Sequence, residues 1–235
     1  GPLLISDNTT ILGGDCKAGI ASILEAITSV REDAAQNISF EVAFTRQEEI
    51  GLVGARNLDY SKITAKEAIV FDGEGPVTQM TSSSPTHVGF EINIKGKAAH
   101  AGVEPEKGIS AVRIASELIT ILPQGRLDEE TTFNIGVVTG GSVTNAVPEN
   151  ASIKGEFRSH NPATLSGIQG ILQNAITQVS NMFPEAIIDI NQNTHFERYN
   201  LTGKESSVKT VTKAFENLGL EYSLKPSGGG TDANI

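Results

Sequence analysis

The chain is organised around residues 45–51, which read TRQEEIG and place Glu48 and Glu49 side by side. An apolar run at residues 40–44 precedes these acids and has the residue types of a buried strand, so we expect a strand over residues 38–45. Adjacent carboxylates repel each other, which raises their pKa values unless a cation lies nearby. The stretch predicts either a metal site, in which one Glu ligates and its neighbour acts as a base, or two solvated glutamates in a loop.

Composition narrows the classes of function. The chain has 235 residues, enough for one large domain or two small ones, and 38% of them are hydrophobic. Its formal net charge of −10 argues against a nucleic-acid surface and suits a site that collects cations. The one cysteine, Cys16, excludes an internal disulfide and is compatible with a reducing compartment, so we expect a cytoplasmic protein. No apolar run reaches membrane-spanning length, so no membrane partner is expected.

Two more segments carry acids that are candidates for the same site. Asp15 follows two glycines and opens a predicted amphipathic helix that runs to about Val30, where its carboxylate could serve only as a helix cap. Asp72 follows a second apolar run, residues 67–71, which we expect to be a buried strand. Ligand crevices of open α/β sheets lie beyond the carboxyl ends of the strands, so these acids and Glu48/Glu49 form a candidate divalent-metal cluster. Acids also end strands as turn residues, so coincidence stays open.

Nucleotide binding is disfavoured. The glycines before Asp15 lack the spacing of a dinucleotide fingerprint and are not followed by the Lys-Ser/Thr ending of a phosphate loop.

The middle of the chain has a different pattern from its two ends. Alternating or apolar runs predict four strands and two helices in the order β-α-β-β-α-β, which is typical of a ferredoxin-like layer with one antiparallel sheet and two helices on one face. The strands are expected at residues 87–95, 132–138, 151–158 and 186–190, and the helices at 109–122 and 161–179. We therefore expect a second domain over residues 85–197, inserted into a first domain made of residues 1–84 and 198–235. A helix near residues 208–218 and a glycine-rich loop at 227–232 belong to the return segment.

Seven short motifs, taken in order, resemble the co-catalytic zinc peptidases that include aminoacylase, carboxypeptidase G and peptidase T, with the peptidase T branch the most similar. They are GDCKAG (14–19), EEIG (48–51), FDGE (71–74), AHAG (99–102), NAVP (145–148), RS (158–159) and GGTDAN (229–234). The resemblance covers nearly the whole chain. It implies an α/β fold in which a three-layer α/β/α catalytic domain carries an inserted ferredoxin-like α+β lid that dimerises.

The resemblance also implies roles for residues of the first domain. Asp15 would bridge two zinc ions, with cobalt or manganese as possible substitutes, while Glu49 ligates one ion and Asp72 the other. Glu48 would be the general base that takes a proton from the attacking water and passes it to the leaving amine. From the residues alone, these acids could equally be solvated turn residues.

The implied roles in the lid and the return segment concern the substrate. His100 would stabilise the oxyanion, often from a dimer partner's lid, and Asn145 would contact the substrate backbone or the oxyanion. Arg158 would bind a substrate carboxylate, a task that suits the planar guanidinium. Gly229 and Gly230 would let the chain approach the substrate closely. The plain alternatives are a loop histidine, a turn asparagine and a surface arginine.

Two features of the family are missing from this sequence. The family supplies one histidine ligand from a His-x-Asp motif upstream of Asp15 and another well downstream of residues 229–232, and neither is present. We therefore expect this chain to be inactive and weakly metalled by itself. Cys16 stands where relatives often carry Asp, either as a harmless substitution or as an oxidation-sensitive thiol near metal.

Two classes of function follow. The first is an exopeptidase with two zinc ions that removes the N-terminal residue of tripeptides or similar small peptides, with an aminoacylase or carboxypeptidase as its nearest rival. The second is a non-catalytic relative that kept the fold as a binding or dimerisation module. In either class, a homodimer through the lid is the expected protein partner.

Overall fold

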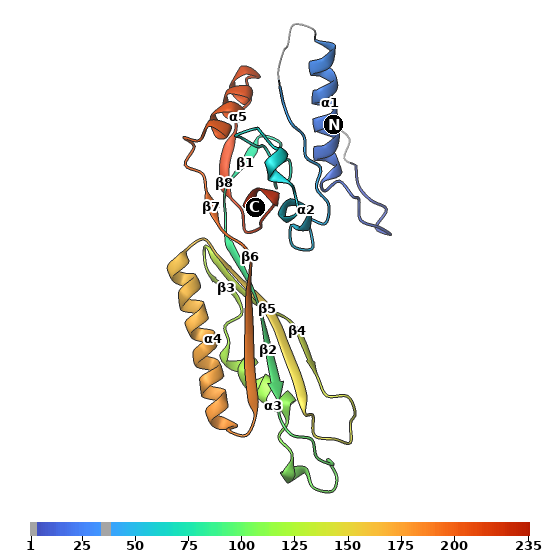
Figure 1. The fold of residues 1–235 in the computed structure, drawn as a ribbon, viewed down its shortest axis with the longest axis vertical. Coiled ribbons are helices and arrows are strands. Elements are labelled where there is room, and N and C mark those ends of the chain that lie inside the picture. Colours follow the sequence, from blue (N-terminus) through green and yellow to red (C-terminus); the bar gives the residue numbers. More distant parts are fainter. Residues whose placement is uncertain (1–3, 34–38) are drawn as a thin grey trace.

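The chain folds into two parts that follow one another along the long axis of the molecule (Figure 1). The structure, a computed structural model, describes residues 4–33 and 39–235. We call the lower part the lid, with the predicted bounds 85–197, and we call the remaining described residues the upper part. Two connections join them: Pro85 lies between strands β1 and β2, and residues 197–198 lie between β6 and β7. The boundaries themselves stay a prediction.

The lid is built on a five-stranded antiparallel sheet in the order β3-β4-β5-β2-β6. Its strands are β2 (Thr86–Lys95), β3 (Gly125–Asp128), β4 (Thr131–Gly140), β5 (Asn150–Ser159) and β6 (Ile187–Phe196). Buried and more exposed residues alternate along β2, because successive side chains of a strand point to opposite faces. One face of the sheet is therefore apolar and the other polar.

Two helices cover the apolar face. They are α3 (Ala111–Ile121) and α4 (Pro162–Met182), which contact each other and both pack on β5. Asn161 begins α4, since its side chain accepts hydrogen bonds from the backbone N–H groups of Ala163 and Thr164. The helices and the sheet share one core, in which the rings of Phe133 and Phe157 stack with centroids 6.1 Å apart. The predicted ferredoxin-like layer is confirmed, with β3 as an additional edge strand.

The upper part collects segments from both ends of the chain. It holds α1 (Lys17–Glu32), α2 (Val53–Arg56), α5 (Ser206–Asn217) and a three-stranded sheet in the order β7-β1-β8. The strands of this sheet are β1 (Gln79–Ser84), β7 (Tyr199–Asn200) and β8 (Ser223–Pro226), and β1 runs parallel to β8. Short 3-10 turns lie at η1 (Tyr60–Lys62) and η3 (Asp232–Asn234), and a further one, η2 (Pro105–Lys107), lies in the lid.

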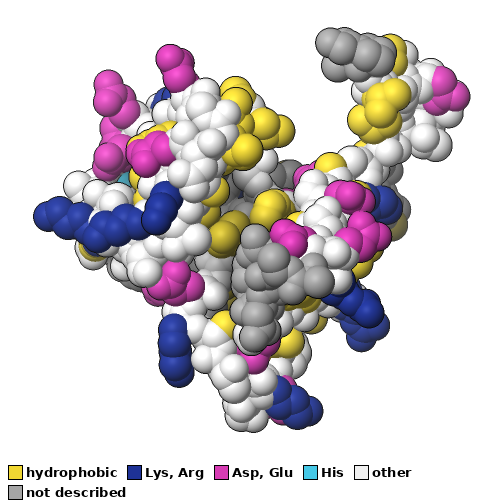
Figure 2. Space-filling view, turned by 90° about the horizontal axis from the view of Figure 1, so that it is seen from above, with side chains coloured by type: hydrophobic (Ala, Val, Ile, Leu, Met, Phe, Trp, Pro, Cys, Tyr) yellow, Lys and Arg dark blue, Asp and Glu magenta, His cyan; other side chains and the backbone are white. Residues whose placement is uncertain are grey.

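The two buried strands expected in the upper part are not formed. Among the described residues, 39–45 and 67–71 pair with no other strand, while Ile38 lies outside the described residues. Their apolar side chains are exposed, for example Phe44 at 52% and Phe71 at 47%, and α1 has no buried residue. Figure 2, which looks down on this end of the molecule, shows hydrophobic side chains open to the surface. A strand depends on hydrogen bonds to a neighbouring strand, so an apolar sequence pattern without such a neighbour does not produce one.

No helix within residues 4–33 or 39–235 is both long enough and apolar enough to cross a membrane.

Candidate active site

A pocket of about 480 Å³ opens in the upper part. Four segments line it: 14–19, 48–49, 71–74 and 227–231, with Thr81 and Tyr199 beside them. The pocket thus brings together Asp15, Glu48, Glu49 and Asp72, the four acids that the sequence placed in one cluster, and adds Glu74.

A tight loop presents Glu48 and Glu49 to the pocket. The backbone N–H of Gly54 donates to the carbonyl of Arg46 at 2.9 Å, which closes the loop at its base. Gln47 and Gly51 have φ angles of 61° and 107°, so the chain reverses sharply on either side of the two acids. There is no room for a side chain at the closed end of this loop, because a Cβ on Gly54 would lie 2.5 Å from the Arg46 carbonyl oxygen.

Three side chains form the one group of potential metal ligands found among the described residues. Ligand atoms of Asp15, Cys16 and Asp72 all lie within 4.8 Å of one another. Asp15 is not the helix cap that the sequence left open as an alternative, because the N-cap of α1 is Cys16 and no side chain caps it. The Cys16 thiol donates to the carbonyl of Phe71, and burial followed by the nearby charge of Asp72 raises its thiol pKa.

The acids of the pocket perturb one another. The pKa of Glu48 is raised to about 7, with burial as the largest cause and the charges of Asp72, Glu49, Asp232 and Asp15 next, in that order. Burial likewise raises the pKa of Asp72 to about 6, with the hydrogen bond and charge of Asp15 next. A carboxylate whose pKa lies near neutrality suits a general base, and repulsion among acids is what a bound cation relieves. The donor set therefore fits a divalent metal.

The glycine-rich loop at residues 227–231 forms the wall of the pocket that faces the lid. Gly229 and Gly230 line the pocket, as the predicted substrate contact requires. The absent side chain of Gly230 makes room for a different neighbour, since a Cβ there would lie 2.3 Å from Cζ of Phe196. Packing against the end of β6 explains this glycine directly.

Asp232 ties this loop to the Glu48 loop. Its carboxylate accepts a hydrogen bond from the hydroxyl of Thr45, while its other oxygen, Oδ1, is buried and has no hydrogen-bond partner among the described residues. The sequence motif contained Asp232 without assigning it a role.

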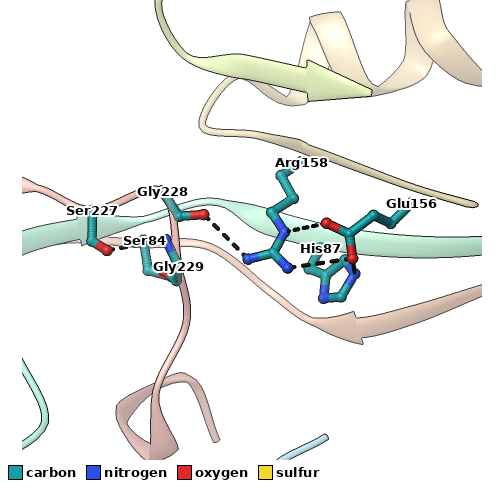
Figure 3. Close-up of polar contacts among 7 residues, drawn as sticks. All are labelled: Ser84, His87, Glu156, Arg158, Ser227, Gly228 and Gly229. Atoms are coloured by element: carbon teal, nitrogen blue, oxygen red, sulfur yellow. Dashed lines mark hydrogen bonds and ion pairs between the residues drawn. The ribbon is translucent and has the colours of Figure 1, made fainter. Parts of the chain in front are cut away.

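Arg158 does not line the pocket, and its side chain lies between Glu156 and the glycine-rich loop (Figure 3). Its Nε and Nη2 donate to the two carboxylate oxygens of Glu156 at 2.9 and 3.3 Å, and its Nη1 donates to the carbonyl of Gly228 at 3.3 Å. Glu156 also lies 2.9 Å from Nε2 of His87. The contact of Arg158 with a substrate carboxylate stays a prediction.

His100 and Asn145 lie together at the far end of the lid. Residues 100 and 146 form an isolated β-bridge, and the backbone N–H of Ala101 donates to the carbonyl of Asn145 at 3.0 Å. Neither residue lines the acidic pocket of the upper part, and the loops that hold them, after β2 and after β4, lie at the end of the lid away from the upper part (Figure 1). If they act on substrate, they reach a pocket other than the one on their own chain.

Comparison with known proteins agrees with these features. Residues 83–181 match a family model described as a peptidase dimerisation domain (M20), and residues 8–116 match a model described as M42 glutamyl aminopeptidase. The uncharacterized protein YqjE of Bacillus subtilis is 39% identical over 98% of this chain and 62% of its own length.

Two solved structures resemble the chain over almost all of its length. A tripeptidase from Staphylococcus aureus has a TM-score of 0.88 and 32% identity, covering 97% of this chain and 61% of that one. The aminopeptidase PepT of Bacillus cereus has a TM-score of 0.81 and 39% identity, covering 98% of this chain and 61% of that one. This chain therefore spans about three fifths of the length of each relative.

Proposed function

Because this chain belongs to the M20 peptidase family, in the branch that contains peptidase T, we propose that it carries the catalytic base and part of the metal site of an exopeptidase that acts on tripeptides or similar small peptides. The observation that supports this most is Glu48, a half-buried carboxylate with a pKa near 7 beside the Asp15, Cys16 and Asp72 group. Few structural roles require a glutamate with that pKa in a pocket of acids.

The metal site is proposed for two divalent ions, with zinc as the first candidate. Asp15 and Asp72 would hold them together with Glu49, and Cys16 adds a fourth donor from the same pocket. Such ions polarise a peptide carbonyl and make water more acidic. None of the four histidines of the chain belongs to the ligand group, so the histidine ligands of the family would come from outside these residues.

Glu48 would move the proton. It would accept a proton from the attacking water and deliver it to the amine that leaves, and a pKa near 7 lets one carboxylate do both at neutral pH. The carboxylate of Asp232 accepts a hydrogen bond from Thr45, and its charge contributes to that raised pKa.

The lid would act across a homodimer. His100 and Asn145 lie at the end of the lid away from their own pocket, and the match to a peptidase dimerisation domain covers residues 83–181. We propose that a partner's lid delivers both residues to the pocket, where they would stabilise the oxyanion and hold the substrate backbone.

Three compounds, each incubated with the complete gene product and zinc, test the choice of substrate. A free tripeptide should be cleaved after its first residue, whereas the same tripeptide with an acetylated N-terminus and an N-acetyl amino acid should be left intact. Cleavage of the acetylated tripeptide at its last bond would indicate a carboxypeptidase, and cleavage of the N-acetyl amino acid an aminoacylase. No cleavage of any of them, with metal bound, would favour the non-catalytic relative.

A further inference from the structure

A network of three charged or polar side chains occupies the polar face of the lid sheet next to the upper part. His87 lies opposite Arg158, and Gly89 opposite Glu156, on the paired strands β2 and β5. His87 and Arg158 side chains are only 14% and 27% exposed, and Glu156, at 36%, links them. The two partners hold the pKa of Glu156 at about 2, with the hydrogen bond from His87 the largest cause, so its carboxylate is charged at neutral pH.

The contact between Arg158 and Glu156 fixes the direction of the guanidinium. Two nitrogens of a planar group bound to two oxygens of a carboxylate define both the plane and the orientation of the arginine. The third nitrogen, Nη1, then points away from Glu156 and donates to the carbonyl of Gly228 (Figure 3). A lysine at this position could not form that two-point contact.

Residues at the junction of the lid and the upper part also hold the carbonyl groups on either side of Gly228. Nε2 of His160 lies 3.0 Å from the carbonyl of Ser227, and the hydroxyl of Ser84 donates to the carbonyl of Gly229 at 2.8 Å. Three consecutive carbonyl groups of the glycine-rich loop are therefore bound by residues of β1, β5 and the segment after β5. Ser227 and Gly229 themselves line the acidic pocket.

We propose that Glu156 is a positioning residue of the pocket: by orienting Arg158 it holds the glycine wall, residues 227–230, at the distance from the acids that the bound peptide requires. The lid thereby acts on the pocket of its own chain through this wall, in addition to any contribution from a partner. Arg158 contacts the wall through the carbonyl of Gly228 and carries the effect of Glu156 to it. The effect on turnover rests on the proposed peptidase function, but the effect on the loop does not.

Amide hydrogen exchange tests the effect on the loop without any need for activity. In Glu156→Gln, the backbone amides of residues 227–231 should exchange at least about tenfold faster, because the charge-assisted contact that orients Arg158 against the loop is lost. The matched control is Glu91→Gln, which removes an ion pair with Lys154 on the same face of the same two strands. Arg158→Lys serves as a second variant and should loosen the loop as well.

Unchanged exchange in both Glu156→Gln and Arg158→Lys would overturn the proposal, as would equal acceleration in the Glu91→Gln control.

Kinetics on paired substrates separates positioning from direct binding. A tripeptide and the same tripeptide with a C-terminal amide differ only in the terminal carboxylate. If the network positions the wall, Glu156→Gln should lower kcat/KM by about tenfold or more on both substrates. If Glu156 acts only by orienting Arg158 toward the substrate carboxylate, the loss in Glu156→Gln will disappear on the amide, and the proposal is wrong. An inactive wild-type protein would contradict the peptidase function while leaving the exchange result to decide this inference.

Discussion

Glu48 shares a pocket with several other carboxylates, and this crowding raises the pKa of its side chain. Burial and the charges of Asp72, Glu49, Asp232 and Asp15 all favour its protonated form. The same environment that suits a base near neutral pH also destabilises the fold when the acids are ionised and no cation is bound.

Replacing Glu48 with Gln should abolish peptidase turnover while the protein still binds metal. The amide has nearly the same shape but cannot accept a proton, so kcat should fall by about 10²–10⁴-fold, the range for loss of a general base. Activity and metal content are measured on the same preparation of the complete gene product. Survival of more than a tenth of the activity would show that the base is another residue.

The acids should also make the metal-free protein less stable as pH rises. The pKa of Glu48 is about 7 in the fold against 4.5 for an ordinary Glu, and that of Asp72 is about 6 against 3.8. A group whose folded pKa is raised contributes stability below its unfolded pKa and loses it as pH rises through the folded value, so the loss falls between about pH 4 and 7.

Thermal unfolding of Glu48→Gln tests this, since other groups titrate in the same range and only the difference from wild type reports on Glu48. In the metal-free protein the variant should melt at a higher temperature than wild type at pH 8 and show no such gain at pH 4. A difference in melting temperature that does not change with pH would contradict the account. Glu91→Gln, on the lid, should track wild type throughout.

At the level of single residues, the sequence predicted which acids lie together but not which contacts fix the loops that carry them. Asp15, Glu48, Glu49 and Asp72 line one pocket, as their places beside glycine turns and apolar runs suggested. The bonds from Ser84 to Gly229 and from Thr45 to Asp232 join residues 145 and 187 positions apart, and contacts at such separations have no local sequence signature. No role was assigned to Glu156 from the sequence.

Among the elements, the glycine-rich loop is the one whose packing can be tested most simply. Gly230→Ala places a methyl group against the ring of Phe196, where a Cβ would lie 2.3 Å from Cζ, so the free energy of unfolding should fall by about 1–3 kcal/mol. Gly228→Ala, two residues earlier, has no atom within 4 Å of its added Cβ and should change stability by less than about 0.5 kcal/mol. Equal effects of the two substitutions in chemical denaturation would show that the Phe196 contact is not the reason for this glycine.

The elements of the lid were predictable, and two of those in the upper part were not, for one physical reason. Every strand of the lid sheet has its hydrogen-bonding neighbours within residues 86–196, so the alternating pattern of β2 matched a real apolar face. The apolar runs at 40–44 and 67–71 have no paired strand among the described residues, and their side chains stay exposed. The apolar pattern indicates that these segments favour burial, but a sheet forms only where a neighbouring strand supplies partners for the backbone hydrogen bonds.

For the whole molecule, the distance between His100 and the acidic pocket leads to a test by mixing subunits. Glu48→Gln and His100→Ala should each be inactive as homodimers, the first for lack of a base and the second for lack of an oxyanion contact. Random exchange of subunits between the two should restore about a quarter of the wild-type activity, because half of the dimers then hold one intact site out of two. No recovery after verified subunit exchange would show that His100 does not act in a partner's pocket.

The most direct test of the central claim, that the acids of the upper part hold divalent metal for peptide hydrolysis, is elemental analysis of the complete gene product. After incubation with zinc and removal of the excess, we predict about two divalent ions per chain, as in a two-metal site. Asp72→Asn should contain less metal, whereas Glu91→Gln should match the wild type. A wild-type protein that retains no divalent metal under these conditions would contradict the account and leave a metal-free binding module as the better description.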